Sequence, residues 1–468
     1  MAGTFGSLEI ARRALGAQQI GIDVTGHNIA NANTKGYSRQ RVELVTTQPV
    51  VGGTYPPLSI GTGVEAKAIA RLRDGFVSEQ VRKEINNFGY WEEQNKVLSQ
   101  LELVFAEPSE NGISRALTRF WSGWEKLAAR PEDPSLRSIV REEAVSFTES
   151  VRHLYTQMLT LEKDLDKQLR LEVQEINSLA QQIADLNALI GKAAAQGTAP
   201  NDLLDRRDLL LEELARLTTI TVHPQAAGQI NVNIGGISLV SGVNVRKLTF
   251  SEPEGVPAQV KWEGLDQDVN WQGGAVAGII RARDQIIPSY RARLDDFAAT
   301  FIAEFNAIHA AGYGLDNQTG IAFFQGTGAQ NWSVNPAILD DNNDGLSLIA
   351  AASEPDKAGD GSNAALLAGL KEKVLTFSSG MGTVDNFFAS LISSLGVESK
   401  NAQRMVQNQS QLVEHLSTWQ ESISGVSLDE EMTNLIRYQH AYSAAARAVT
   451  AIDEMLDTII NRLGLVGR

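Results

Sequence analysis

The sequence predicts an elongated, mainly α-helical protein of several domains with a small β-rich insert. Three features of the apolar pattern predict it: a seven-residue repeat at both ends of the chain, long helical periods between the ends, and a period of two confined to residues 220–262. We therefore expect paired coiled-coil helices at the termini, a helical-bundle middle domain and one small β domain.

The composition is that of a folded chain without thiol chemistry. Its 468 residues carry 41 Lys and Arg against 56 Asp and Glu, and the net charge of −15 disfavours a protein that coats nucleic acid. A cysteine count of zero removes thiol nucleophiles, disulfides and cysteine-ligated metals. No apolar run approaches the roughly 18 to 20 residues of a membrane span. The first residues lack the features of a secretory signal, so we do not expect export by the general pathway.

A seven-residue repeat predicts the N-terminal helix. Its apolar positions are Leu8, Leu15, Ile22 and Ile29, and a second row three residues later is small or polar. These rows have the spacing of the a and d positions of a coiled coil. An ordinary core-facing helix is the alternative for one such stripe, but a matching stripe at the other terminus favours a pair.

A longer repeat of the same kind predicts the C-terminal helix. A helix from Leu428 to Leu463 would be roughly 50 Å long at 1.5 Å per residue. Only the N-terminal stripe is patterned to cover it, so we expect the two termini to pair and the chain to run out along the molecule and back. The residues that we expect at contacts between subunits are Leu8, Leu15, Ile22, Ile29, Leu435, Tyr442, Val449, Leu456 and Leu463.

Helical periods also fill most of the interior. Residues 312–380, rich in Gly, Asn, Asp and Pro, are expected to be mainly loop. Gly191 is predicted to end the longest interior helix, because glycine commonly follows the last helical residue. The interior helices are expected over residues 77–105, 113–127, 135–191, 203–217 and 288–308.

Short strands are predicted where apolar residues alternate. Alternation occurs around Val222, Val232, Leu248 and Val260, and glycines separate the runs as turns do. The chain then divides into a terminal coiled-coil domain of residues 1–60 with 410–468, a mainly helical middle domain of residues 61–217 with 285–409, and a β-rich outer domain of residues 218–284.

The sequence holds no recognisable catalytic motif. It lacks a Gly-Lys-Ser/Thr phosphate loop, a dinucleotide fingerprint, a His-Glu-x-x-His pair and a Gly-x-Ser-x-Gly elbow. Two carboxylate pairs, Asp205 with Asp208 and Asp295 with Asp296, are interpreted as parts of solvated helix faces. We expect no enzyme activity and no cofactor.

The best metal candidate is the acidic run from Asp340 to Gly345. It places oxygen ligands at the first positions of a calcium-binding loop. The twelfth position, where a bidentate Glu is needed, is Ala351. An Asx-rich turn is therefore favoured over a metal site.

A polar segment follows the N-terminal stripe. The pattern Asn-x-Ala-Asn-x-x-Thr-x-Gly-Tyr is matched by Asn28, Ala30, Asn31, Thr34, Gly36 and Tyr37. A simple helix stop explains the glycine but not the repeated asparagines. The pattern resembles the N-terminal signature of the bacterial flagellar axial proteins, the family of rod, hook and hook-associated proteins.

Three further blocks are similar to the hook-associated members of that family. The likeness covers essentially the whole chain. The blocks are Asn-Asp-Leu-Leu-Asp-Arg-Arg-Asp at residues 201–208, residues 305–312 with 320–324, and residues 430–442.

The resemblance implies a structural role at the junction between hook and filament. A protein of this kind forms a ring on the hook end. The implied partners are further copies of the chain, the hook protein, the second junction hook-associated protein and an export chaperone, with no nucleic acid and no membrane insertion. The resemblance also implies export through the flagellar type III secretion system and an extracellular location in the flagellum.

Two alternatives stay open. A hook or distal rod protein would share the N-terminal signature but lack the interior blocks at residues 201–208 and 305–312. A wall-modifying hydrolase carried on the flagellum would need a cleft with carboxylates of shifted pKa, and no pair in the sequence stands out as one.

Overall fold

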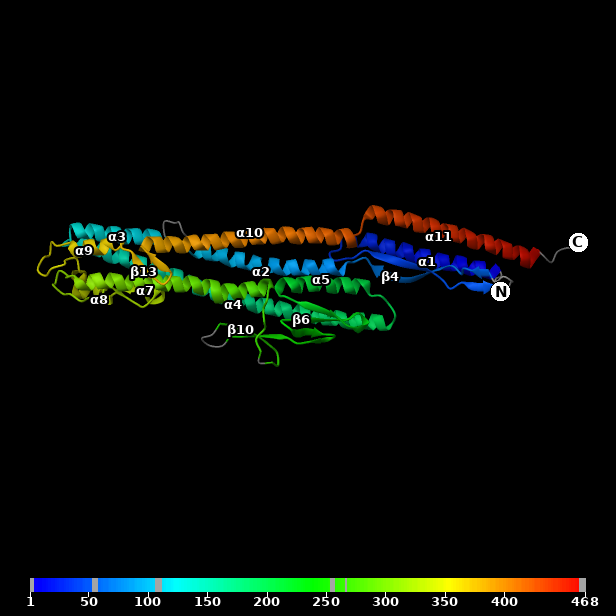
Figure 1. Cartoon of the computed structure of the whole chain (residues 1–468), viewed down its shortest axis with the longest axis horizontal. Coiled ribbons are helices and arrows are strands. Elements are labelled where there is room, and N and C mark those ends of the chain that lie inside the picture. The colour runs from blue at the N-terminus through cyan, green and yellow to red at the C-terminus, as the bar shows by residue number, and fades with distance from the viewer. Residues whose placement is uncertain (1–3, 53–57, 106–111, 253–256, 266, 463–468) are drawn as a thin grey trace.

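The structure, a computed structural model, is an elongated and mainly helical molecule (Figure 1). The two chain ends lie together at one end of the long axis. In the described part of the chain, no helix is long and apolar enough to cross a membrane. The predicted fold class is confirmed. The structure describes residues 4–52, 58–105, 112–252, 257–265 and 267–462.

Most helices run lengthwise, side by side (Figure 1). A π-helical turn, Ala282–Ile286, joins α6 to α7, and a second one, Thr458–Arg462, follows α11. The α-helices are α1 (Thr4–Ala30), α2 (Gly75–Phe105), α3 (Ile113–Ala129), α4 (Pro134–Ala195), α5 (Asn201–Leu217), α6 (Gly274–Arg281), α7 (Ile287–Ala311), α8 (Pro336–Leu339), α9 (Ser362–Gly369), α10 (Val384–Ser424) and α11 (Leu428–Asp457).

The terminal helices α1 and α11 pair at one end of the molecule, as predicted, and run in opposite directions (Figure 1). A two-stranded antiparallel ribbon of β1 (Gln40–Thr46) and β4 (Val64–Arg71) also packs against α1. Residues 61–71, assigned above to the middle domain, therefore lie against the terminal helix. We call α1, α11 and this ribbon the terminal unit. The predicted helix to Leu463 extends beyond the described residues.

We call the segment from α2 to α10 the body, and most of its buried apolar residues form one hydrophobic core. Helices α2, α4, α7 and α10 lie along it, and α3 closes the end opposite the termini (Figure 1). The core contains an aromatic cluster: Phe120, Trp124, Phe301 and Phe305 are fully buried, and the ring of Phe305 contacts the other three. Burial of such large side chains supplies most of the stability of a domain.

The β insert packs on α4 and shares the body core. Its main sheet is antiparallel with the order β5-β6-β7-β8, and Ile230, Val232 and Ile234 of β6 are buried while the residues between them are not. This alternation is the one predicted. The remaining strands are β2 (Val50–Gly52), β3 (Leu58–Ile60), β5 (Thr221–Pro224), β6 (Ile230–Ile234), β7 (Ile237–Ser241), β8 (Asn244–Val245), β9 (Leu248–Ser251), β10 (Gln259–Trp262), β11 (Phe324–Gln325), β12 (Ser333–Val334), β13 (Leu375–Phe377) and β14 (Gly380–Gly382).

Two helix limits differ from prediction. Helix α4 does not stop at Gly191 but continues to Ala195. A Cβ on Gly191 would lie 2.7 Å from the side-chain amide nitrogen of Gln229, so this glycine lies at a close side-chain contact inside the helix and not at its end. The helix expected from residue 288 is preceded by α6, whose Gly278 lies against the backbone of Tyr90 of α2.

Candidate functional site

The signature residue Asn28 is buried near the end of α1, where α1 meets the turn that follows it, β1 and α11. Its Nδ2 donates to the backbone oxygen of Gln40 at 2.8 Å and to Oε2 of Glu431 at 2.8 Å. Its Oδ1 accepts from the backbone nitrogen of Gln40 at 3.0 Å and from the hydroxyl of Tyr37 at 2.8 Å. Because a primary amide carries two donors and an acceptor with two lone pairs, asparagine satisfies all four contacts.

The rest of the signature shapes the turn after α1. Nδ2 of Asn31 donates to the backbone oxygen of His27 at 3.0 Å, and the hydroxyl of Thr34 donates to Oδ1 of Asn31 at 3.2 Å. Gly36 has φ +81°, in the left-handed region that favours glycine. Burial and nearby carboxylates raise the pKa of Tyr37, so its hydroxyl remains a proton donor.

The start of α5 meets the signature from the body. Nδ2 of Asn201 donates to Oε1 of Gln40 at 3.0 Å and to the backbone oxygen of Ile69 at 2.9 Å. Nε2 of Gln40 donates to Oδ1 of Asp202 at 2.8 Å. The N-terminal signature and the block at residues 201–208, far apart in the sequence, are therefore joined through Gln40.

Asp205 and Asp208 connect α5 to the ribbon. Asp205 accepts from the backbone nitrogen of Ser38 at 3.0 Å and from Nη1 of Arg71 at 2.7 Å. Asp208 accepts from Arg71 at 2.9 Å and also pairs with Arg73. The interpretation of this pair as a solvated face is wrong, because β4 brings arginines onto α5 in a long-range contact that helical periodicity does not reveal.

The second carboxylate pair is also not simply solvated. Both side chains are half-buried on α7. Asp295 accepts from the backbone nitrogen of Ala329 at 2.9 Å, and Asp296 from that of Ser378 at 2.9 Å. These carboxylates hold two loops of the body that the sequence left unassigned.

Glu431 is a functional candidate that the sequence analysis did not single out. It lies in the first turn of α11 and is 2% exposed. Nε of Arg39 donates to its Oε1 at 2.9 Å, and Nη2 of Arg39 lies 2.7 Å from the same oxygen. The neighbouring Glu430 also pairs with Arg39, at 2.7 Å, but at the surface. In the sequence, only the adjacent Glu430 and Glu431 at the start of the block at residues 430–442 pointed to this position.

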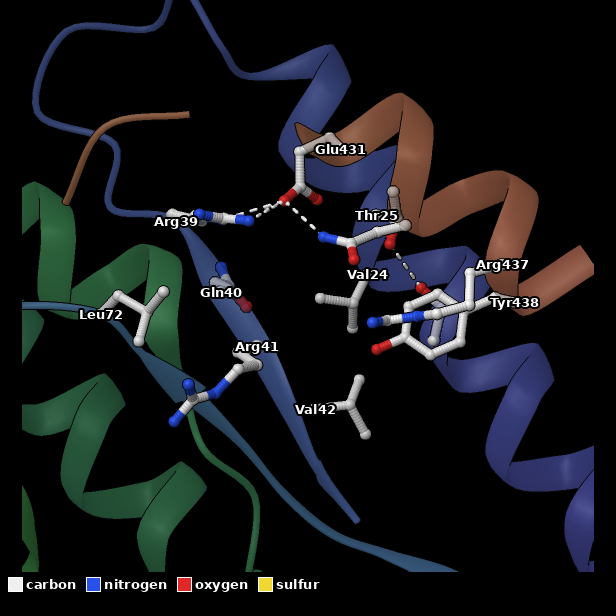
Figure 2. A pocket seen from close by; sticks show the side chains of 12 residues that line it. Val24, Thr25, Arg39, Gln40, Arg41, Val42, Leu72, Glu431, Arg437 and Tyr438 are labelled. Carbon is white, nitrogen blue, oxygen red and sulfur yellow. Dashed lines mark hydrogen bonds and ion pairs between the residues drawn. The ribbon is translucent and has the colours of Figure 1, made fainter. Parts of the chain in front are cut away.

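A cavity of about 240 Å³ lies beside these contacts, between α1, β1 and α11 (Figure 2). Val24 and Val42 form an apolar part of its wall, and Arg41 and Arg437 also line it. The guanidinium of Arg437 lies 5.3 Å from the ring centre of Tyr438. The carboxylate that lines the cavity is already engaged by Arg39, so the cavity lacks the free acid and base that hydrolysis would need.

The block at residues 305–312 lies at the end of the body opposite the chain termini. Oδ1 of Asn306 accepts from the backbone nitrogens of Phe323 and Phe324, both at 2.9 Å, and its Nδ2 donates to the oxygen of Phe324 at 2.9 Å. His309 is fully buried, and both ring nitrogens contact backbone groups. The block at residues 305–312 is thus structural, since it holds the segment at residues 320–324.

The described residues among those predicted at subunit contacts lie on α1 and α11. The four on α1 are half-buried, as are Leu435, Val449 and Leu456 on α11. Tyr442 is 37% exposed, and Leu463 lies outside the described residues. Ala30 of the signature is exposed at the last residue of α1. The role of these residues between subunits stays a prediction.

The acidic run at residues 340–345 is a turn. Oδ1 of Asp340 accepts from the backbone nitrogen of Asn342 at 3.0 Å, and its Oδ2 from Nδ2 of Asn343 at 2.6 Å. These bonds lower the pKa of Asp340. Across the described residues, no group of three or more His, Asp or Glu side chains could hold a metal ion.

Comparisons with known proteins show what the whole chain is similar to. The flagellar hook-associated protein 1 of Bacillus subtilis is 32% identical over 507 aligned positions, which cover 100% of both chains. The chain belongs to the flagellar hook-associated protein 1 family. Further members of this family are similar at 25% identity: those of Salmonella typhimurium and of Escherichia coli, each aligned over 96% of this chain and 98% of the relative.

Family models match three segments. Residues 98–324 match the flagellar hook-associated protein FlgK helical domain, residues 8–37 the flagella basal body rod protein, and residues 421–463 the flagellar basal body rod FlgEFG protein C-terminal segment. A solved structure of the flagellar hook junction protein FlgK from Burkholderia pseudomallei aligns with a TM-score of 0.62 over 74% of this chain and 100% of that one, at 16% identity. At that identity, the similarity to this solved structure supports only the fold of the chain.

Proposed function

We propose that the chain is a structural component of the bacterial flagellum that joins the hook to the filament. The observation that carries the proposal is the similarity to a flagellar hook-associated protein 1 along the full length of both chains. The hook junction protein of Burkholderia pseudomallei, which has the same fold, supports it. An extracellular place in the flagellum follows from this role.

The terminal unit has the surface that assembly would need. On the first turns of α11, Leu428, Met432 and Ile436 are each about half exposed, at 50%, 48% and 50%. Their spacing of four residues places them along one side of the helix. Exposed apolar rows of this kind are covered when a partner binds. We therefore propose that this row belongs to the surface between subunits, together with the predicted contact residues on α1 and α11.

The finer parts of the proposal concern partners and domains. Copies of the chain would form a ring on the hook end, with the hook protein on one side and the second junction hook-associated protein on the other. An export chaperone would bind near α11 before passage through the type III secretion system. The division into terminal, helical middle and β-rich outer domains belongs to the same proposal.

Co-sedimentation with isolated hooks tests the junction role. We expect the full-length chain to pellet with hooks, and a chain lacking residues 425–468 to stay in solution while it keeps the circular dichroism of the helical body. Substitution of Leu435 and Val449 by serine should weaken pelleting at least tenfold. The matched control replaces Leu171 and Leu366, exposed leucines of the body at 63% and 60%, by serine and should pellet normally.

Failure of the full-length, folded chain to pellet would overturn the junction role. No observation favours a hydrolase in its place, because Asp205 and Asp208 are both engaged by arginines.

A further inference from the structure

Two contacts one heptad apart join α1 to α11. Glu431 accepts from Asn28 at 2.8 Å, and the ring of Tyr438 lies against Gly21, where an added Cβ would be 2.8 Å from two ring carbons. The step from Asn28 to Gly21, seven residues toward the start of α1, therefore matches the step from Glu431 to Tyr438, seven residues toward the end of α11. An antiparallel pair requires this correspondence.

The apolar contacts between α1 and α11 favour the observed register only weakly over a register shifted by one heptad. Of the described residues of α11, Glu431 and Ile452 alone are buried. Several buried positions on α1, including Ala11, Ala17 and Gly21, carry small side chains. Small side chains offer similar packing when one helix slides by a heptad, so other contacts must choose between the alternatives.

Both heptad contacts oppose such a slide. If α11 moved by seven residues so that Tyr438 faced Ala14, a Cβ would stand where the ring now packs. Glu431 would at the same time lose its bond to Asn28 and its ion pair with Arg39. A buried carboxylate without these partners is strongly unfavourable, whereas a single buried polar contact is a known device for fixing helix register.

We propose that Glu431 and Tyr438 are positioning residues that fix the register in which the two ends of the chain pair. Arg39 extends this effect to the body, because its backbone nitrogen donates to the oxygen of Ser424 at 2.8 Å at the end of α10. The register therefore also sets where the terminal unit sits along the molecule. This pairing is internal to the chain and does not depend on the proposed junction role.

Distance measurements between two spin labels test the proposal. The chain has no cysteine, so Gln19→Cys with His440→Cys gives one label on each helix. Both positions are exposed, and the observed register places them opposite each other. A slide by one heptad would separate the labels by about 10 Å along the axis, at 1.5 Å per residue. Distances are read by double electron–electron resonance in the free protein and after mixing with isolated hooks.

We expect one narrow distance in the otherwise unchanged chain. Asn28→Leu with Glu431→Leu should add a second, longer distance that accounts for at least a third of the molecules, while helical circular dichroism is kept. Glu431→Gln, which can still accept from Asn28, should stay closer to a single distance. Glu454→Leu, an exposed position on α11, is the matched control and should change nothing.

A merely stabilising role predicts the opposite pattern, with lost helicity and an unchanged distance in the molecules that remain paired. That pattern would overturn the proposal, as would several distances in the unchanged chain in both states. If the double leucine variant loses its helical signal and gives no measurable distance, Tyr438→Ala decides, because it frees the space at Gly21 without altering a buried charge. A single unchanged distance in Tyr438→Ala would also overturn the proposal.

Discussion

Helices α4 and α11 belong to the same chain but are held in place by different kinds of contact. Helix α4 has 62 residues, of which 20 are buried, whereas α11 has 30 residues with two buried among those described. The body is a complete hydrophobic core. The terminal unit depends on small side chains, hydrogen bonds and ion pairs and leaves apolar surface exposed. A body with a well-packed core can therefore present an end whose packing is left for neighbours to complete.

The largest expected effect is the loss of an aromatic ring from the body. Phe305→Ala should lower the free energy of unfolding by about 3 to 5 kcal/mol, because it opens a cavity among Phe120, Trp124 and Phe301. Urea unfolding followed by tryptophan fluorescence measures it. Ile452→Ala in α11 should leave that transition within about 0.5 kcal/mol. Equal effects would break the comparison between the two regions.

The second-largest expected effect is a loss of stability of the body at acid pH. His309 is fully buried, and burial lowers its pKa to about 4. Its Nε2 accepts from the backbone nitrogen of Ala350 at 3.0 Å, which requires the neutral ring. Since the unfolded chain binds the proton near pH 6.5 and the folded body does not, stability is full above pH 6.5 and falls as the pH drops toward 4.

This loss should reach about 3 kcal/mol at pH 4. Unfolding in urea at pH 7, 5.5 and 4 measures it. His309→Gln should be less stable at pH 7 but should lose the slope between pH 6.5 and 4. A slope that survives in this variant would assign the acid sensitivity to other groups.

A smaller effect concerns the contact between the two regions. Asp205→Asn removes the charge that faces Arg71 and should cost about 2 kcal/mol. Because the contact joins the ribbon to α5, the loss should show as faster hydrogen exchange in β1 and β4 and not in α4. Asp164→Asn, which disturbs an exposed pair with Lys167, is the control, with an expected effect below about 0.5 kcal/mol. Uniformly faster exchange in α4 would show that the two regions unfold together.

The smallest expected effect separates two glycines of α1. Gly21→Ala places a methyl group against the ring of Tyr438 and should destabilise the terminal pair by about 1 kcal/mol. Gly26→Ala meets no atom within 4 Å and should stabilise the helix by about 0.5 to 1 kcal/mol. Hydrogen exchange in α1 and α11 measures both. Changes of the same sign would contradict the packing of Tyr438 on Gly21.

Much of the fold could be predicted because helical and strand periods are local properties. The stripes on α1 and α11 predicted that the termini pair, but they pointed to Leu15 and Ile22, which are only half-buried. The buried contacts use Gly21 and Asn28, and neither a glycine nor an asparagine contributes to an apolar pattern. Helix α6 was missed for a related reason, because its two glycines have low helix propensity, while Gly278 lies against the backbone of α2 and Gly274 against the end of α5.

The contacts of the candidate site could not be predicted from spacing. Asp205 lies 134 residues from Arg71, and Glu431 lies 403 residues from Asn28. Only the fold brings these side chains together. The resemblance to a family marked most of these residues as parts of separate blocks, and the structure shows that the N-terminal signature is connected to both the block at residues 201–208 and the block at residues 430–442.

The packing of α10 has a mechanical consequence. Its buried residues all lie between Val384 and Ala402, and the helix continues to Ser424 without another buried residue. A rod that is clamped along its first half and only supported along its second behaves as a cantilever. A sideways load on the chain ends should therefore bend α10 beyond Ala402 and leave the buried first half undistorted. One half of the helix would then be flexible and the other half rigid.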